Sequence, residues 1–292
     1  MSLFPQRPAS QRAPRPGSTV PTPSTPPTRP GGGGSGGVSS GGHWGLLQTL
    51  LGALAAPFEP GEAARSVSNR LAIRQVFFTG FEALPLVSVI AFFVGATIVL
   101  QMQIMAVQLP GELVGRIIVA TVLRELAPLV TAIIVTGRSG TAIATELGNM
   151  KADSEFLALS SLGIDPLRFI VWPRMVGAIL SVMVLTVYFG MIAILSGYVI
   201  GAAIGTSTFS SLQAGFAEAI VPEDLFLYLA KCGGLGLIVG WLSCHYGLEV
   251  QGSPTEVPQK ASKAVIRTLL AAVIYNTVVT AGFYMVVGPP IR

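Results

Sequence analysis

The sequence predicts an all-α integral membrane protein with about five transmembrane helices, an N-terminal interfacial helix and a short cytoplasmic helix. Of the 292 residues, 51% are hydrophobic and only 11% are charged. Soluble domains carry about 25% charged residues, so this composition indicates a chain that lies largely in lipid. The apolar residues also gather in long runs, and a run of roughly 20 residues is what a helix needs to cross a bilayer.

The net charge of +4 does not indicate a nucleic-acid-binding protein. Basic residues of membrane proteins collect in cytoplasmic loops, and the sequence has no dense cluster of Lys and Arg with interleaved aromatic residues. Cys232 and Cys244 lie in one apolar run without CxxC spacing, and His43 and His245 are isolated. We therefore expect no metal site and no disulfide framework.

Three parts follow one another along the chain. Residues 1–42 are rich in Pro, Ser and Gly, and such a segment buries too little apolar surface to fold, so we expect a disordered cytoplasmic tail. A plastid transit peptide is the alternative for this tail. Residues 43–80 are expected to form interfacial helices, because the apolar run at 43–57 is shorter than the roughly 20 residues of a span. Residues 81–292 form the predicted transmembrane domain.

Five spans are predicted within this domain, at about 82–107, 113–138, 168–204, 224–247 and 264–288, with a polar loop at about 249–263. Glycines at four-residue spacing predict close packing between helices, at Gly197, Gly201 and Gly205 and again at Gly236 and Gly240.

The charges predict how the spans are oriented. Basic residues fall on one side of the predicted membrane, namely Arg65, Arg70, Arg74, Lys151, Arg168, Arg174, Lys260 and Lys263. Acidic residues fall largely on the other side, namely Glu112, Glu218, Glu223 and Asp224, and Arg116 is an exception near that side. Because basic loops stay in the cytoplasm, we expect a cytoplasmic N-terminus and an external C-terminus.

Arg124 and Glu125 are the sharpest feature of the second span. Ionisable groups in the membrane cost a few kcal/mol each, so these two should face protein or water. Adjacent residues of a helix point about 100° apart, so each should find its partner on another helix or across a dimer axis. Two interpretations remain open. The pair is either a structural polar clamp, or a functional element that contacts a charged headgroup or acts as a gating switch. Residues at spacings of three and four put a largely polar face on this helix: Thr121, Arg124, Pro128, Thr131, Val135 and Arg138.

Two further polar residues lie within predicted spans. Lys231 in the fourth span is expected to reach toward the membrane surface with its long side chain. Asn276 in the fifth span is expected to form a hydrogen bond between helices.

The segment ELGNMKADSEFLALSSLG at 146–163 is the second notable stretch, and its residues 150–162 are predicted to form the short cytoplasmic helix. Gly163 should stop this helix, and Asp165-Pro166 should begin the next element. From its pattern alone it is an ordinary loop helix, whereas its link to a polar membrane helix is typical of a transport element driven from outside the membrane. The chain lacks a GxxxxGK[ST] phosphate loop, HExxH and GxSxG, so we expect it to be no enzyme and to hydrolyse no ATP itself.

The run LRELAPLVTAIIVTGRSGTAIATELGNMKADSEFLALSSLGIDPLRFIVWPR closely resembles the MlaE (YrbE) permease family. The resemblance covers about 45–290 and includes GATIVLQMQ at 95–103. The pattern E-L-G-x-M-K…G-I-D-P-L…P-R is long, and therefore much more specific than a short motif.

This resemblance implies a homodimer with the MlaE permease fold, in a bacterial inner membrane with a periplasmic C-terminus. Such permeases belong to ABC transporters that move glycerophospholipids between inner and outer membranes and maintain outer-membrane lipid asymmetry. The implied partners are a cytoplasmic MlaF-like ATPase, a MlaB-like STAS protein, a periplasmic MlaD-like ring of MCE domains, and phospholipid. ATP and Mg²⁺ would bind to the ATPase, and this chain would hold no cofactor.

Matching positions imply two sets of site residues. The lipid cavity would include Leu100, Gln103, Val107, Arg124 and Glu125. Coupling to the ATPase would involve Glu146, Gly148, Met150, Lys151, Glu155 and Leu159 in a coupling helix at about 146–162. The sequence departs from the family pattern at Asn276, where an acidic residue is expected, and at Phe156, where a polar residue is commoner. A membrane scaffold for a periplasmic ring and an ion-coupled secondary transporter remain alternatives.

Overall fold

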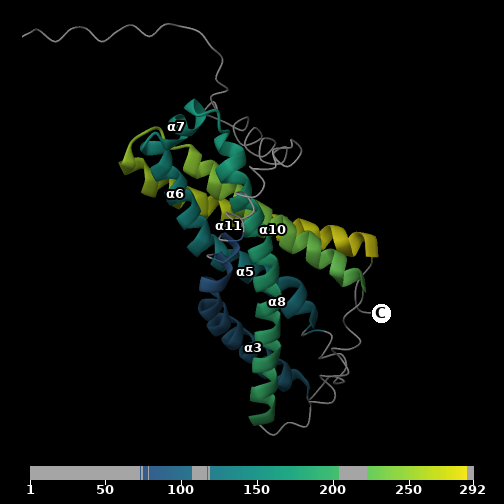
Figure 1. The fold of residues 1–292 in the computed structure, drawn as a ribbon. Coiled ribbons are helices and arrows are strands. Elements are labelled where there is room, and N and C mark those ends of the chain that lie inside the picture. Colours follow the sequence, from purple (N-terminus) through teal and green to yellow (C-terminus); the bar gives the residue numbers. More distant parts are fainter. Residues whose placement is uncertain are drawn as a thin grey trace, which may run out of the picture. The chain divides into compact units, whose positions relative to one another are not determined.

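The computed structural model describes residues 73, 75–77, 79–106, 117, 119–203 and 222–287. All elements in these ranges are helical. In chain order they are η2 (Phe81–Ala83), α3 (Leu84–Ala106), η3 (Val119–Leu126), α5 (Ala127–Val135), η4 (Thr136–Gly140), α6 (Thr141–Ala152), α7 (Glu155–Ser161), η5 (Leu167–Val171), α8 (Trp172–Ala203), α10 (Pro222–Leu248), η6 (Pro254–Glu256) and α11 (Val257–Val287), shown in Figure 1. The predicted tail at 1–42 and most of the predicted interfacial helices at 43–80 lie outside the described residues.

Five helices among the described residues are long and apolar enough to cross a membrane, which confirms the five predicted spans. They run over Gln75–Ile98, Thr121–Ala152, Phe169–Gly197, Phe226–Leu248 and Pro254–Met285. Many large apolar side chains on these helices are exposed, including Phe93, Val184 and Ile274. Exposed apolar faces of this kind are suited to lipid or to another membrane-embedded surface.

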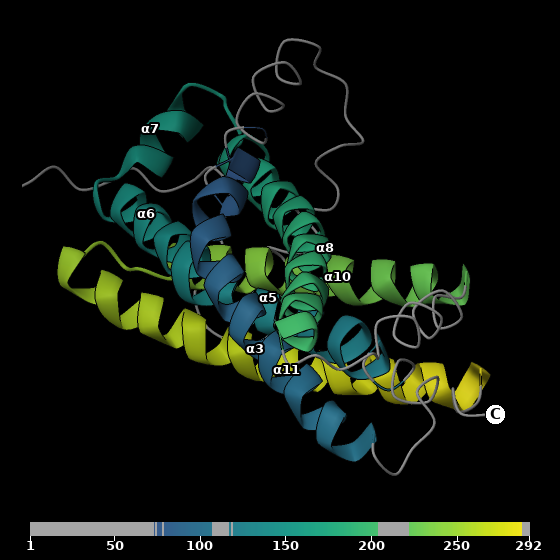
Figure 2. The ribbon, with the colours of Figure 1, turned by 90° about the horizontal axis from the view of Figure 1, so that it is seen from below.

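The packing of the spans centres on α8 and α10. Helix α8 packs against α3 on one side and α10 on the other, and α10 also packs along α11, as both ribbon views show (Figures 1 and 2). A Cβ atom on Gly236 would lie only 2.5 Å from the Cα atom of Ile179, and one on Gly240 only 3.0 Å from that of Met175. The predicted glycine packing face of the fourth span is therefore confirmed, and its contact is α8.

The second span is longer than the predicted 113–138, because the helix continues through η4 and α6 to Ala152. The segment TGRSG at 136–140 forms a wide π-helical turn within this helix. Two hydroxyl groups support this turn: Thr136 donates to the carbonyl oxygen of Ala132 at 2.7 Å, and Thr141 donates to that of Gly137 at 2.8 Å. Extra-wide turns of this kind occur inside helices without ending them.

The short helix predicted at 150–162, like the coupling helix implied at about 146–162, is divided between two helices in the structure. Helix α6 ends at Ala152, and α7 begins at Glu155. Between them Ser154 has a left-handed backbone with φ of 60°, which a continuing right-handed helix does not allow. Gly163, with φ of 76°, follows α7 as predicted. Asp165 then accepts a hydrogen bond from the backbone N–H of Leu167 at 3.0 Å, which confirms that it begins the next element.

The predicted polar loop at 249–263 is shorter in the structure, because α11 already begins at Val257. Proline is well tolerated in the first turn of a helix, where its missing N–H has no partner to lose, and Pro258 occupies such a position. Lys260 and Lys263 therefore lie on the first turns of α11 and not in a loop.

Candidate functional site

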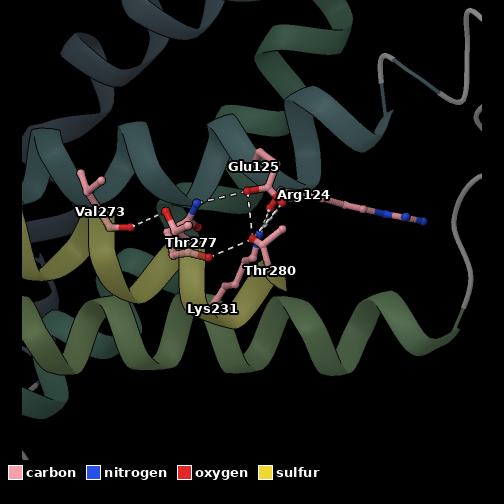
Figure 3. A network of polar contacts seen from close by, with 7 residues as sticks. Arg124, Glu125, Lys231, Val273, Thr277 and Thr280 are labelled. Atoms are coloured by element: carbon pink, nitrogen blue, oxygen red, sulfur yellow. Dashed lines mark hydrogen bonds and ion pairs between the residues drawn. The ribbon is translucent and has the colours of Figure 1, made fainter. Parts of the chain in front are cut away.

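A buried ion pair connects the second and fourth spans (Figure 3). The ammonium group of Lys231 on α10 lies 2.7 Å from Oε1 of Glu125 on η3. The side chain of Lys231 is 1% exposed, and that of Glu125 is 32% exposed. The prediction that Lys231 reaches the membrane surface is therefore wrong, because a carboxylate compensates its charge inside the protein.

The backbone around Glu125 contributes to holding this lysine. Lys231 also donates a hydrogen bond to the carbonyl oxygen of Arg124 at 2.7 Å. In a regular helix the carbonyl group of Arg124 would accept from the backbone N–H of residue 128. Because that residue is Pro128, which has no N–H, this carbonyl group can accept from Lys231 instead. Glu125 itself lies on the π-helical segment η3 (Val119–Leu126), and wide turns of this type are frequent at functional sites.

The fifth span completes the network around Glu125. Asn276 on α11 donates from Nδ2 to Oε2 of Glu125 at 3.1 Å, which confirms its predicted role between helices. The hydroxyl group of Thr280 lies 3.0 and 3.1 Å from the two carboxylate oxygens and 2.8 Å from the carbonyl oxygen of Asn276. Its single proton serves one of these acceptors at a time. One carboxylate thus connects η3, α10 and α11.

Arg124 and Glu125 point in different directions, as expected for neighbours on a helix. Figure 3 shows the Arg124 side chain extending away from the Glu125 and Lys231 pair. Glu125 finds its partner on another helix, as the sequence predicted.

The predicted polar face of the second span is turned inward along its middle. Its members Pro128, Thr131 and Val135 are buried, whereas Thr121 is exposed. At the far end Arg138 forms an ion pair with Glu82 on η2. This face is therefore occupied by contacts within the chain over most of its length.

The predicted cavity residues of the first span are placed only in part. Leu100 lies on α3 with 40% of its surface exposed. Gln103 is on the same helix, but its side chain is not among those described, and Val107 lies outside the described residues.

The predicted coupling residues are distributed over α6 and α7. Glu146 forms an ion pair with Arg174 of α8 at 2.8 Å. Gly148 is buried, and a Cβ atom there would lie 3.0 Å from Val257 and 3.2 Å from Val250. Met150 and Leu159 pack partly into one apolar cluster with Phe156.

The two remaining coupling residues lie near the junction of the helices. The Lys151 ammonium group lies 5.8 Å from the centre of the Phe156 ring. Glu155 is exposed at the start of α7.

Sequence reasoning did not single out the exposed leucines of this region. Leu157 on α7 is 71% exposed and Leu162, just after it, is 73% exposed. No residue of α7 is buried. The available signal was the presence of large apolar residues in a short segment that does not span the membrane.

The chain is similar to known membrane permeases over most of its length. The sequence model described as permease MlaE matches residues 72–281. A probable ABC transporter permease protein of Rickettsia conorii is 32% identical over 225 residues, which cover 74% of this chain and 84% of that protein. The intermembrane phospholipid transport system permease protein MlaE of Haemophilus influenzae is 25% identical, over 72% of this chain and 82% of that protein. The chloroplastic protein trigalactosyldiacylglycerol 1 of Arabidopsis thaliana is 25% identical, over 76% of this chain and 64% of that protein.

The family match covers well over half of the chain, and it falls on the helices that carry the Glu125 network and the α6 and α7 pair. The bacterial relatives are named as permeases, which are transport subunits and not enzymes. This chain therefore belongs to the MlaE permease family and is a multi-pass membrane permease of an ABC transporter.

Proposed function

We propose that this permease carries glycerophospholipids between the inner and outer membranes of a bacterium, driven by ATP that a separate subunit hydrolyses. The name of the Haemophilus relative, an intermembrane phospholipid transport system permease, supports this substrate class. The observation that carries the mechanism is one helical run that connects Glu125, the partner of the buried Lys231, to the exposed helix α7.

This run extends from Glu125 through α5, η4 and α6 to Ala152 without a break. At 1.5 Å per residue it is about 40 Å long, enough to cross the membrane. One end forms the ion pair with Lys231, and the other end leads through the Ser154 turn into α7. A push on α7 therefore moves Glu125 against partners that lie on α10 and α11.

Helix α7 is the part of this run that a partner would contact. It has no buried residue, and its exposed apolar side chains lie outside the spans. An ATPase subunit that binds ATP and Mg²⁺ would dock here, as a MlaF-like protein, on the cytoplasmic side. A MlaB-like STAS protein and a periplasmic MlaD-like ring of MCE domains would complete the assembly around a homodimer of this chain.

A phospholipid requires an apolar surface for its acyl chains and a cation or donors for its phosphate. Arg124 extends away from the Glu125 and Lys231 pair and would supply the cation (Figure 3). Leu100, Gln103 and Val107 would supply the apolar and polar lining in the dimer. Movement of Glu125 displaces Arg124 as well, because the two residues are adjacent on one helix.

The test is ATP-dependent transfer of a fluorescent glycerophospholipid from vesicles that contain the permease and its co-purified ATPase. We expect transfer by the wild-type complex and loss of transfer with Arg124→Ala, with or without Glu125→Ala. Arg124→Lys, which keeps the charge, should retain part of the activity, and the melting temperature of each variant controls for folding.

Three results would contradict the proposal. If the Arg124→Ala, Glu125→Ala double variant transferred lipid at the wild-type rate, these two residues would not form the transport site. An assembled complex that moves no lipid would favour the scaffold alternative, and transport driven by an ion gradient without ATPase would favour the secondary transporter.

A further inference from the structure

A second charged site lies where α10 ends and α11 begins. Here a cavity of about 300 Å³ is lined by Tyr246, Glu249, Lys260, Lys263, Ile266 and Arg267. The three basic residues are spaced by three and four positions, so they share one face of α11. Asn276 of the Glu125 network lies 13 positions beyond Lys263, or about 20 Å along the helix, so the two sites are separate.

The charges in this cavity do not balance. Lys260 forms an ion pair with Glu249 at 3.0 Å. Lys263 and Arg267 are both exposed, and neither has an ion-pair partner within the described part of the chain. Three cations and one carboxylate leave a net charge of +2, which is suited to an anion.

The position of the cavity along α11 coincides with the headgroup layer of a bilayer. From Thr268 to Val287 the helix contains no charged residue. These 20 residues extend over about 30 Å, the thickness of the hydrocarbon core. Arg267 is therefore the last charged residue before the hydrocarbon, and Lys260 and Lys263 lie one to two turns further out.

An apolar surface continues from the cavity toward the hydrocarbon. Ile266, Leu270 and Ile274 follow one another at four-residue spacing, and all three are exposed. A ligand with an anionic head and an apolar tail would meet cations first and this stripe next.

We propose that this cavity binds the phosphate headgroup of an anionic glycerophospholipid of the surrounding bilayer, with an acyl chain along Ile266, Leu270 and Ile274. Basic pockets between transmembrane helices are suited to such headgroups because they offer several cations at headgroup depth. The bound lipid is a resident of the bilayer at this end of the helices, and its binding does not depend on which substrate the permease transports. It would stabilise the connection between α10 and α11, against which Gly148 of α6 packs.

The test uses full-length protein in nanodiscs of phosphatidylglycerol and phosphatidylcholine. After transfer to detergent, the lipids that remain bound are quantified by mass spectrometry. We expect the wild type to retain phosphatidylglycerol in preference to phosphatidylcholine. Lys263→Gln with Arg267→Gln should lower that preference about tenfold or more, because each cation near the membrane surface strengthens anionic-lipid binding severalfold.

Two further variants act as controls. Ser262→Gln changes an exposed residue of the same helix that does not line the cavity, and should leave the preference unchanged. Glu249→Gln releases Lys260 from its ion pair and should raise the preference, which gives a readout even if the double variant folds poorly.

An unchanged preference in both the double variant and Glu249→Gln would overturn the proposal. Displacement of the bound phosphatidylglycerol by millimolar inorganic phosphate would assign the cavity to free phosphate instead. A disulfide between two copies of Lys263→Cys would show that a second copy of the chain covers this face, and would also overturn it.

Discussion

The carboxylate of Glu125 and the ammonium group of Lys231 form a 2.7 Å ion pair between residues 106 positions apart in the sequence. The two partners are not equally buried, because Lys231 is 1% exposed and Glu125 is 32% exposed. Glu125 also has donors on α11, whereas Lys231 has, among the described residues, one backbone carbonyl group as its other hydrogen-bond acceptor. Loss of the Glu125 carboxylate should therefore destabilise the protein more than loss of the Lys231 ammonium group.

This asymmetry predicts that Glu125→Gln destabilises the protein more than Lys231→Met. Loss of one member of a buried ion pair costs about 3–5 kcal/mol when the other charge stays buried. Glu125→Gln leaves the buried ammonium group without a counter-charge. Lys231→Met leaves a carboxylate that keeps the donors of Asn276 and Thr280, so its cost should be about 3 kcal/mol or less. Melting temperatures of the purified variants in detergent measure the difference.

The double variant Glu125→Gln, Lys231→Met is the control for this comparison. It removes both charges, so it should melt at a higher temperature than Glu125→Gln alone. A double variant less stable than either single variant would show that the ion pair is not the source of the effect.

Gly236 and Gly233 offer a matched pair of substitutions on α10. A Cβ atom on Gly236 would lie 2.5 Å from the Cα atom of Ile179, whereas one on Gly233 meets nothing within 4 Å. Gly236→Ala should therefore push α8 and α10 apart and cost about 1–3 kcal/mol. Gly233→Ala should be neutral or stabilising, because alanine favours a helix over glycine. Equal melting temperatures for the two variants would contradict the close contact between α8 and α10.

Ser154 sets the turn between α6 and α7 through its left-handed backbone. Ser154→Gly should preserve the turn, since glycine adopts this conformation without steric cost. Ser154→Val should strain the turn by about 1–3 kcal/mol and lower lipid-stimulated ATP hydrolysis by the assembled complex. Ser160→Val, on α7 itself, is the control, because it makes the same change at a position with a helical backbone. Undiminished stimulation in Ser154→Val would mean that the turn does not transmit movement.

The spans could be predicted from the sequence because their signal is local. A run of apolar residues indicates a helix in the membrane whatever the rest of the chain does, and each of the five predicted runs overlaps an observed span. The glycine spacing at Gly236 and Gly240 predicted a close helix contact for the same reason, but it could not name α8 as the neighbour. The length of the second span was missed because hydroxyl groups of Thr136 and Thr141 support a segment whose glycines suggest a break.

For the site, the sequence predicted that each charged residue in the membrane needs a partner, but not which residue that partner is. A charged residue in the membrane requires a partner, so Glu125 was expected to find one on another helix. Lys231 was expected to reach the surface because lysine usually does so from a helix end. Its actual partner depends on the packing of η3 against α10, which no sequence pattern shows. The break at Ser154 was hidden for a similar reason, since serine and aspartate occur both within helices and at their ends.

Two leucines of the α7 region give the most direct test of docking from the cytoplasm. Leu157 and Leu162 are 71% and 73% exposed, so replacing both with aspartate removes little packing within the chain. Leu157→Asp with Leu162→Asp should leave the melting temperature of the permease unchanged. It should abolish co-purification of the ATPase, because an apolar contact would then have to bury two unpaired carboxylates, which costs several kcal/mol. Ser160→Asp, exposed on the same helix, adds one carboxylate without removing an apolar side chain and should weaken binding less. An ATPase that still co-purifies with the double variant would place its binding surface elsewhere on the permease.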